Sequence, residues 1–323
     1  MKVLILGISG SGKSTFTKQM IVIHQGFSTY EEERYKSILH QNVLIGIQEL
    51  VKYTDKLELK VSNENRKTAR YFIEMIVLEE VLDEKLAQKV KKIWNDPAIQ
   101  NAWVMAPQMQ LQMNNMEYLI SNLDRMCLPD YKPSVEDILQ ARQRTTGQQT
   151  TTFTKDKYTW ELIDVGGQRP EREKWENIIQ HTQLHAVIYF AGLDEYNMNS
   201  SEAQGKTKMA ISMQVWEEVL HTIEKHQICL LLFLNKMDLF EKKIKNESDF
   251  NDFKTILGYS GPQDADECSK FLRDKFLAIT QKMEYSEIHA HVICALDTSA
   301  ITTVFEAVKE DIFMKRLATT QHF

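Results

Sequence analysis

The hydrophobic pattern divides the chain into parts where strands alternate with helices and one part that is helical throughout. Short, continuous apolar runs have the length of strands that are buried on both faces of a parallel sheet. These expected strands lie at 3–6, 158–163, 186–190, 229–234 and 291–293. The helical stretches between them lie near 15–20, 170–182, 206–225, 264–283 and 299–317. The alternation predicts an α/β fold with a doubly wound, mostly parallel sheet that binds its ligand at the carboxyl ends of its strands.

Residues 28–141 show apolar positions at helical spacing without a convincing strand, and several prolines interrupt the pattern. The expected helices are 30–53, 68–82, 84–95 and 113–127. We therefore predict an all-helical domain over 28–141, inserted after the first helix of an α/β domain. That α/β domain consists of residues 1–27 and 142–323.

Composition narrows the class of protein. Of 323 residues, 43% are hydrophobic and 26% are charged, as in globular proteins with a sizeable core. A net charge of −6 without a dense Lys/Arg run argues against a nucleic-acid partner. The four cysteines form no C-x-x-C pair, so we expect reduced thiols rather than disulfides or a zinc site. No apolar segment reaches the length of a membrane span, and no secretory signal is recognisable.

The first expected strand leads into a sequence that fits G-x-x-x-x-G-K-[ST], the phosphate-binding loop of P-loop nucleotide enzymes. The loop consists of Gly7, Ile8, Ser9, Gly10, Ser11, Gly12, Lys13 and Ser14, and Thr15 follows it in the first helix. Backbone N–H groups would face phosphate oxygens, Lys13 would reach the outer phosphates, and Ser14 would ligate Mg²⁺. An ordinary Gly/Ser turn is the alternative, but strand, loop and helix occur here in the required order. We therefore expect a nucleoside diphosphate or triphosphate to bind.

A second phosphate motif, Asp164 to Gln168, follows the apolar strand that ends at Ile163. A carboxylate at this strand end would hold Mg²⁺ through water. Gly167 would let a backbone N–H approach the γ-phosphate, because no Cβ intrudes, and Gln168 would orient an attacking water. Taken alone, the motif is equally compatible with a tight turn. Its position downstream of a P-loop favours the catalytic interpretation.

Asn235-Lys236-Met237-Asp238 follows the expected buried strand 229–234 and predicts selection of guanine. The Asp238 carboxylate would accept hydrogen bonds from guanine N1–H and the exocyclic amine, and adenine lacks both donors at these positions. Lys236 would cover the base, Asn235 would brace neighbouring loops, and the Ala295 N–H would donate to guanine O6. Alone, the four-residue pattern could be a solvated turn, so its weight comes from the order of all three motifs.

The sequence Arg142-Gln143-Arg144-Thr145-Thr146-Gly147 lies where the helical block meets the next strand. Its first arginine would lean on the charge that develops on a phosphate during transfer. Thr145 would complete the Mg²⁺ shell. A capping turn with an exposed arginine is the alternative for this segment by itself.

Together these motifs resemble those of the α subunits of heterotrimeric G proteins, over essentially the whole chain. The resemblance rests on 13–15 with 18–20, Trp94-Asn95-Asp96-Pro97, Arg142 to Gly147, Asp164 to Arg169 with Trp175, and 233–240. It implies a Ras-like GTPase domain with an inserted helical domain. It also implies nucleotide contacts at Leu139, Gln140, Ala141 and Arg142. GTPases of the Ras kind share the phosphate and guanine motifs, but they lack the insertion and the built-in arginine.

The resemblance implies a slow GTP hydrolase that acts as a signalling switch, with GTP as substrate and GDP as product. Gln168 would orient the water and Arg142 would stabilise charge on the γ-phosphoryl group. The Mg²⁺ ligands would be Ser14, Thr145 and, through water, Asp164. The switch segments would be 142–153, 166–182 and 194–205, ordered by the γ-phosphate and released on hydrolysis.

Partners and location follow from the same resemblance. A βγ dimer would bind the GDP state, effectors and GTPase-accelerating proteins would read the switches, and a seven-helix receptor would engage the C-terminal helix within 299–323. The full-length protein would act at the cytoplasmic face of the plasma membrane through a lipid anchor outside this chain. The chain begins inside the first strand, so either it was trimmed or it lacks the family's N-terminal helix. As written, we expect it to be soluble, to bind nucleotide well, and to bind βγ and membrane poorly.

Three positions depart from the family pattern. The related loops usually carry glycine at Ser9 and glutamate at Gly10, and that glutamate pairs with the arginine at Arg142. We therefore expect weaker closure of the two domains and faster GDP release. A switch arginine, here Arg172, usually pairs with a glutamate at the position of Ile211, so we expect one missing anchor.

Two alternatives stay open. One is a Ras-like or translation-type GTPase with an unrelated helical insertion, against which Trp94 to Pro97 and Arg142 argue. The other is a nucleotide-gated binding module with negligible turnover, caused by Ser9 and the missing contacts. A P-loop ATPase or kinase is disfavoured by Asp238.

Overall fold

The computed structural model describes residues 1–74, 81–105, 111, 113, 115–224, 226, 228–281 and 288–320. The chain forms two compact units. The first, here named the sheet unit, comprises Met1–Gly26 and Arg144–Phe323. The second, the helical unit, comprises Phe27–Gln143. None of the helices in the described part of the chain combines the length and apolarity needed to cross a membrane.

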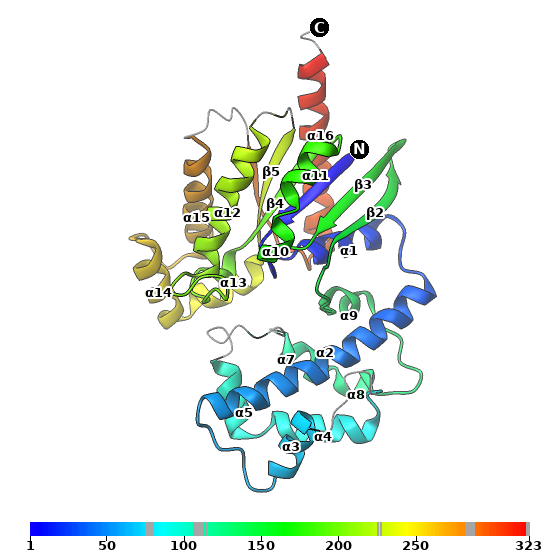
Figure 1. The fold of residues 1–323 in the computed structure, drawn as a ribbon, viewed down its shortest axis with the longest axis vertical. Helices are drawn as coiled ribbons and strands as arrows, with labels where there is room; N and C mark the ends of the chain where they lie inside the picture. The colour runs from blue at the N-terminus through cyan, green and yellow to red at the C-terminus, as the bar shows by residue number, and fades with distance from the viewer. Residues whose placement is uncertain are drawn as a thin grey trace. The chain divides into compact units, whose positions relative to one another are not determined.

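A six-stranded sheet forms the centre of the sheet unit, in the order β2-β3-β1-β4-β5-β6. Figure 1 labels β2, β3, β4 and β5 of this sheet. The strands are β1 (Lys2–Gly7), β2 (Gln148–Lys155), β3 (Tyr158–Val165), β4 (Ala186–Gly192), β5 (Cys229–Asn235) and β6 (His289–Val292). Neighbouring strands are parallel except for β2, which is antiparallel to β3. The pattern of apolar runs does not mark β2, because this edge strand fully buries only Phe153.

Helices cover both faces of the sheet, so the unit is doubly wound as the alternation predicts. They are α1 (Lys13–His24), α10 (Arg169–Arg172), α11 (Trp175–His181), η1 (Leu193–Glu195), α12 (Lys208–Ile223), α13 (Met237–Lys245), α14 (Glu247–Leu257), α15 (Ala265–Thr280) and α16 (Thr298–Thr320). Side chains alternate along β1. Val3 and Ile5 belong to the core formed with α1 and α16, whereas Leu4 and Leu6 belong to the core formed with α11, α12 and α15.

The helical unit contains helices and no strand among its described residues. These helices are α2 (Thr29–Lys56), α3 (Arg66–Glu74), α4 (Glu84–Trp94), α5 (Pro97–Val104), α7 (Met116–Ser121), α8 (Leu123–Met126) and α9 (Val135–Gln140). Their apolar faces form one core around α2. Ser28 caps α2 with a capping box to Glu31, which explains why the helix begins at Thr29.

The periodicity misplaced several helix ends. The single helix predicted over 113–127 is wrong, because the chain forms α7 and α8 with a break at Asn122. The prediction of helix up to residue 82 is wrong at its end, since 81–83 are not helical, while 75–80 lie outside the described residues. Sequence periodicity also missed α5, which begins at Pro97 after the Asp96 cap. It missed α13 and α14 as well.

Candidate functional site

The phosphate-binding loop connects β1 to α1 at the carboxyl end of the sheet. Gly12 has φ +103°, and a Cβ there would lie 1.9 Å from Asn235 Nδ2, so only glycine fits. Lys13 Nζ donates to the carbonyls of Gly7, at 2.8 Å, and Ile8, at 3.0 Å. Burial lowers the pKa of Lys13 to about 8. A phosphate group would offer this ammonium stronger acceptors and favour its charged form.

Three residues predicted as Mg²⁺ ligands lie together although they come from distant parts of the sequence. Ser14 Oγ donates to Asp164 Oδ2 at 2.7 Å and lies 2.9 Å from Thr145 Oγ1. Thr145 Oγ1 donates to the same carboxylate oxygen at 3.4 Å. The other oxygen, Asp164 Oδ1, is buried and has no hydrogen-bond partner among the described residues. Burial raises the pKa of Asp164 against the opposing charge of Lys13. The set contains only oxygen donors, which is the chemistry that Mg²⁺ prefers.

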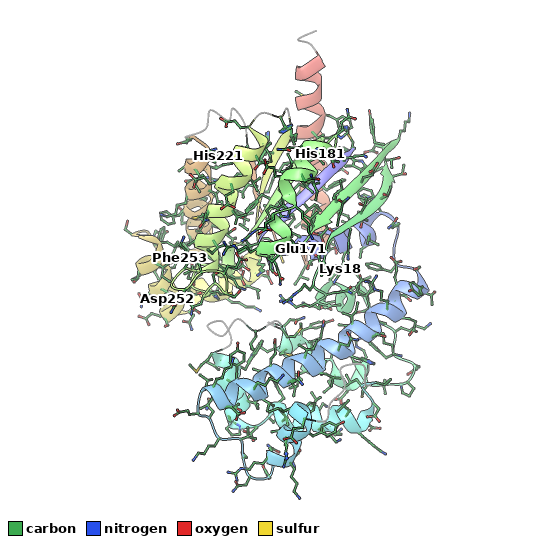
Figure 2. All side chains as sticks on the ribbon, viewed as in Figure 1. Lys18, Glu171, His181, His221, Asp252 and Phe253 are labelled. Carbon is green, nitrogen blue, oxygen red and sulfur yellow. The ribbon has the colours of Figure 1, made fainter. Side chains whose placement is uncertain are left out.

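The loop after β3 packs directly on the phosphate-binding loop. A Cβ on Gly167 would lie 2.5 Å from the Gly7 carbonyl oxygen and 2.6 Å from Lys13 Nζ, so the two loops touch backbone to backbone. Glu171 on α10, labelled in Figure 2, accepts a hydrogen bond from the Gly147 N–H at 3.1 Å. The segment that carries Thr145 is therefore tied to the segment that follows Gly167.

Gln168 has a neighbour that sequence reasoning missed. With its carboxamide oxygen facing Arg144, it accepts hydrogen bonds from Nε at 2.9 Å and Nη2 at 3.1 Å. The signal was available, because Arg144 lies one residue before Thr145, the threonine predicted to bind Mg²⁺. A motif does not show, however, which of its two arginines reaches the glutamine. Arg142, the predicted catalytic arginine, belongs to the helical unit, and Gln168 belongs to the sheet unit.

The residues of the guanine motif are joined by one buried asparagine. Asn235 Nδ2 donates to the Ser11 carbonyl at 2.8 Å, and Asn235 Oδ1 accepts from the Ala295 N–H at 2.9 Å. Asn235 therefore braces the phosphate-binding loop against the loop after β6. Asp238, at the start of α13, accepts a hydrogen bond from Cys294 Sγ at 3.2 Å.

Two acidic residues of η1, which directly follows β4, lie beside Lys236 of the guanine motif. The sequence did not predict this contact. Lys236 Nζ lies 3.0 Å from Asp194 and 3.3 Å from Glu195, and both carboxylates are 1% exposed. Lys236 itself adopts the left-handed backbone conformation, with φ +68°, directly before α13. Polar residues directly after a buried strand are the sequence signal that could have found this pair.

The structure corrects the expected loss of an anchor at Arg172. Ile211 on α12 is buried in the apolar core and offers no charge. Arg172 nevertheless has an acidic partner, because its Nη2 binds Glu202 in the segment before α12. The family pattern indicates a single partner position, that of Ile211, and does not reveal a carboxylate supplied by a different segment.

The end of α9 carries the remaining predicted contacts, all in the helical unit. Leu139 and Ala141 are buried. Asn115 Nδ2 donates to the Gln140 carbonyl at 2.8 Å. Asn42 bonds to the backbone of Arg142 at both its N–H and its carbonyl. Arg142 is thus fixed to α2 through its main chain.

Comparison with known proteins agrees with this geometry. Residues 1–312 match the G-protein alpha subunit family. The chain is 34% identical over 322 residues to the guanine nucleotide-binding protein alpha-2 subunit of Dictyostelium discoideum, covering 97% of this chain and 88% of that protein. It is 32% identical over 323 residues to the alpha-3 subunit of Caenorhabditis elegans, covering 98% and 89%. The chain therefore belongs to the G-protein alpha subunit family, the GTP-binding and GTP-hydrolysing signalling switches of heterotrimeric G proteins.

Proposed function

We propose that Ser14, Thr145 and Asp164 hold the Mg²⁺ that accompanies GTP in this chain. The convergence of three oxygen donors on one point carries the proposal, together with the buried Asp164 Oδ1, which finds no hydrogen-bond partner in the described part of the chain. When bound, the ion would neutralise charge on the β- and γ-phosphates. Lys13 and the N–H groups of the loop would bind the same phosphates, and Gly167 leaves room for a close backbone approach.

The chemical step needs two further groups. Gln168 would orient the attacking water, and Arg142 would stabilise the charge that spreads over the γ-phosphoryl oxygens. Asp238 would select guanine by accepting from its N1–H and amine, with the Ala295 N–H at O6. Discrimination of this kind is strong, because a carboxylate covered by the bound base would be left unpaired if it faced adenine.

The partners follow at the level of the family. A βγ dimer would bind the GDP state, effectors and GTPase-accelerating proteins would read the segments around Gln168 and Glu202, and a seven-helix receptor would engage α16. We place the full-length protein at the cytoplasmic face of the plasma membrane as a peripheral protein.

Single-turnover hydrolysis of pre-bound GTP tests the proposal. Gln168→Leu and Arg142→Ala should each slow hydrolysis by at least about a hundredfold, while GTP still binds stoichiometrically. Asp238→Asn should lose preference for GTP over ATP in competition. Unchanged hydrolysis in both catalytic variants would instead identify a nucleotide-gated binding module. Mg²⁺ assignment is tested separately, since Asp164→Asn should weaken GTP binding in Mg²⁺ but not in its absence.

A further inference from the structure

The chain leaves the helical unit through residues 140–143, and side chains from elsewhere in that unit hold this segment. Residues 141–147 adopt no helix or strand, so their backbone groups need other partners. Asn115 serves the Gln140 carbonyl, and Arg34 Nη2 donates to the Gln143 side chain at 2.9 Å. Arg142 lies between these two points.

Asn42 makes the tightest of these attachments. Its Oδ1 accepts from the Arg142 N–H at 2.6 Å, and its Nδ2 donates to the Arg142 carbonyl at 2.8 Å. One side-chain amide thus satisfies both main-chain groups of one residue, 100 positions away in sequence, as a neighbouring strand would. The side chain is 3% exposed, so breaking either bond would leave a buried polar group unsatisfied.

Asn42 is also costly at its position. It lies in the interior of α2, beside Leu39 and Val43 of the apolar core, where asparagine is a poorer helix former than alanine or leucine. Local rules of helix and core are broken here, and such violations are expected where function requires them. The compensation visible in the structure is the pair of bonds to Arg142.

The helix that precedes this contact, α9, is held at its start by a buried carboxylate. Asp137, in the first turn of α9, is fully buried and accepts hydrogen bonds from Arg125 and Tyr118. Burial acts to raise the pKa of Asp137, but these hydrogen bonds outweigh it and hold the pKa below its usual range. α9 is therefore pinned at its start by Asp137, and the chain just beyond its end is pinned by Asn42.

We propose that Asn42 is a positioning residue for Arg142, which fixes the main chain from which the catalytic guanidinium extends. The inference rests on the proposed function, in which Arg142 stabilises the γ-phosphoryl charge. Displacement of a charge-stabilising group by about 1 Å costs up to about a hundredfold in rate. Loss of the two bonds should therefore slow hydrolysis even though Asn42 itself contacts no substrate.

The test compares Asn42→Ala and the near-isosteric Asn42→Asp in two backgrounds, wild type and Arg142→Ala. Asp keeps the acceptor for the Arg142 N–H but turns a carboxylate oxygen toward its carbonyl. Hydrolysis is measured in single turnover per bound GTP, so that unfolded molecules do not contribute. Asn65→Ala is the matched control, because Asn65 is a buried asparagine of the same unit whose side chain binds Asp96 rather than residues 140–143.

We expect Asn42→Ala and Asn42→Asp to slow hydrolysis by roughly ten- to a hundredfold in the wild type and by less than about twofold in Arg142→Ala. Asn65→Ala should stay within about twofold of the wild type. An equal slowing in both backgrounds, or none in the wild type, would overturn the positioning role and leave the proposed function intact. If Arg142→Ala itself hydrolyses GTP at the normal rate, both the inference and the catalytic assignment of Arg142 fail.

Discussion

Replacement of Glu202 by glutamine tests the ion pair that anchors α10 through Arg172, four residues beyond Gln168. The Arg172 and Glu202 side chains are only 13% and 20% exposed, and Arg172 Nη1 is buried without a hydrogen-bond partner among the described residues. Exposed ion pairs contribute about 0.2–1 kcal/mol, whereas hydrogen bonds to charged groups in shielded sites contribute about 1.5–3 kcal/mol. Because this pair is largely shielded, Glu202→Gln should lower the free energy of unfolding by about 2 kcal/mol.

Urea unfolding of the GDP-bound protein measures this change, in a double-mutant cycle with Arg172→Gln. The double variant should lose less stability than the sum of the single variants, with a coupling of about 1–2 kcal/mol. Glu267→Gln is the matched control, because the Glu267–Lys270 pair is 51% and 54% exposed and its loss should not be measurable. A Glu202→Gln variant as stable as this control, or an additive cycle, would refute the assignment of Glu202 as the anchor.

Three further predictions follow from single positions. Gly167→Ala should slow hydrolysis but retain GDP. Its Cβ would lie 2.5 Å from the Gly7 carbonyl oxygen, where 3.4 Å is ordinary contact, so the two loops would be forced about 0.9 Å apart. Single-turnover rates equal to those of the wild type would contradict this expectation. Gly10→Glu restores the acid of related loops and should slow GDP release, and an unchanged release rate would argue against this effect. The same variant should reduce thermal stability, since φ at this position is +86° and the new side chain would start 3.7 Å from Glu195 Oε1. A second change, Glu195→Gln, should recover part of the lost stability. The depressed pKa of Asp137 adds stability that is fully present above the usual carboxyl pKa of 3.8 and is lost as pH falls below it. Asp137→Asn should therefore be less stable than the wild type at neutral pH. The difference in stability should shrink in acid, as measured by unfolding followed by circular dichroism.

The local chemistry of the nucleotide site could be predicted from sequence because its motifs are continuous in the chain. The phosphate-binding loop needs glycine at Gly12, and the structure shows the reason in the 1.9 Å approach of Asn235. The buried strands were also predictable, since residues enclosed on both faces of a parallel sheet form unbroken apolar runs. Edge strand β2 lacks such a run, because most of its side chains face solvent. The break between α7 and α8 lacks a signal too, because apolar residues are buried on both sides of Asn122.

By itself, the sequence determined that a helical segment interrupts an α/β unit and which residues are the candidates for binding phosphate and guanine, because these properties depend on neighbours along the chain. Only the tertiary structure decided the partners of the key side chains. Glu202 serves Arg172 and Asn42 serves Arg142 across 30 and 100 positions, and Arg144 reaches Gln168 from another segment. Such pairings depend on how strands and helices are brought together, and no local pattern of polar residues encodes which two will meet.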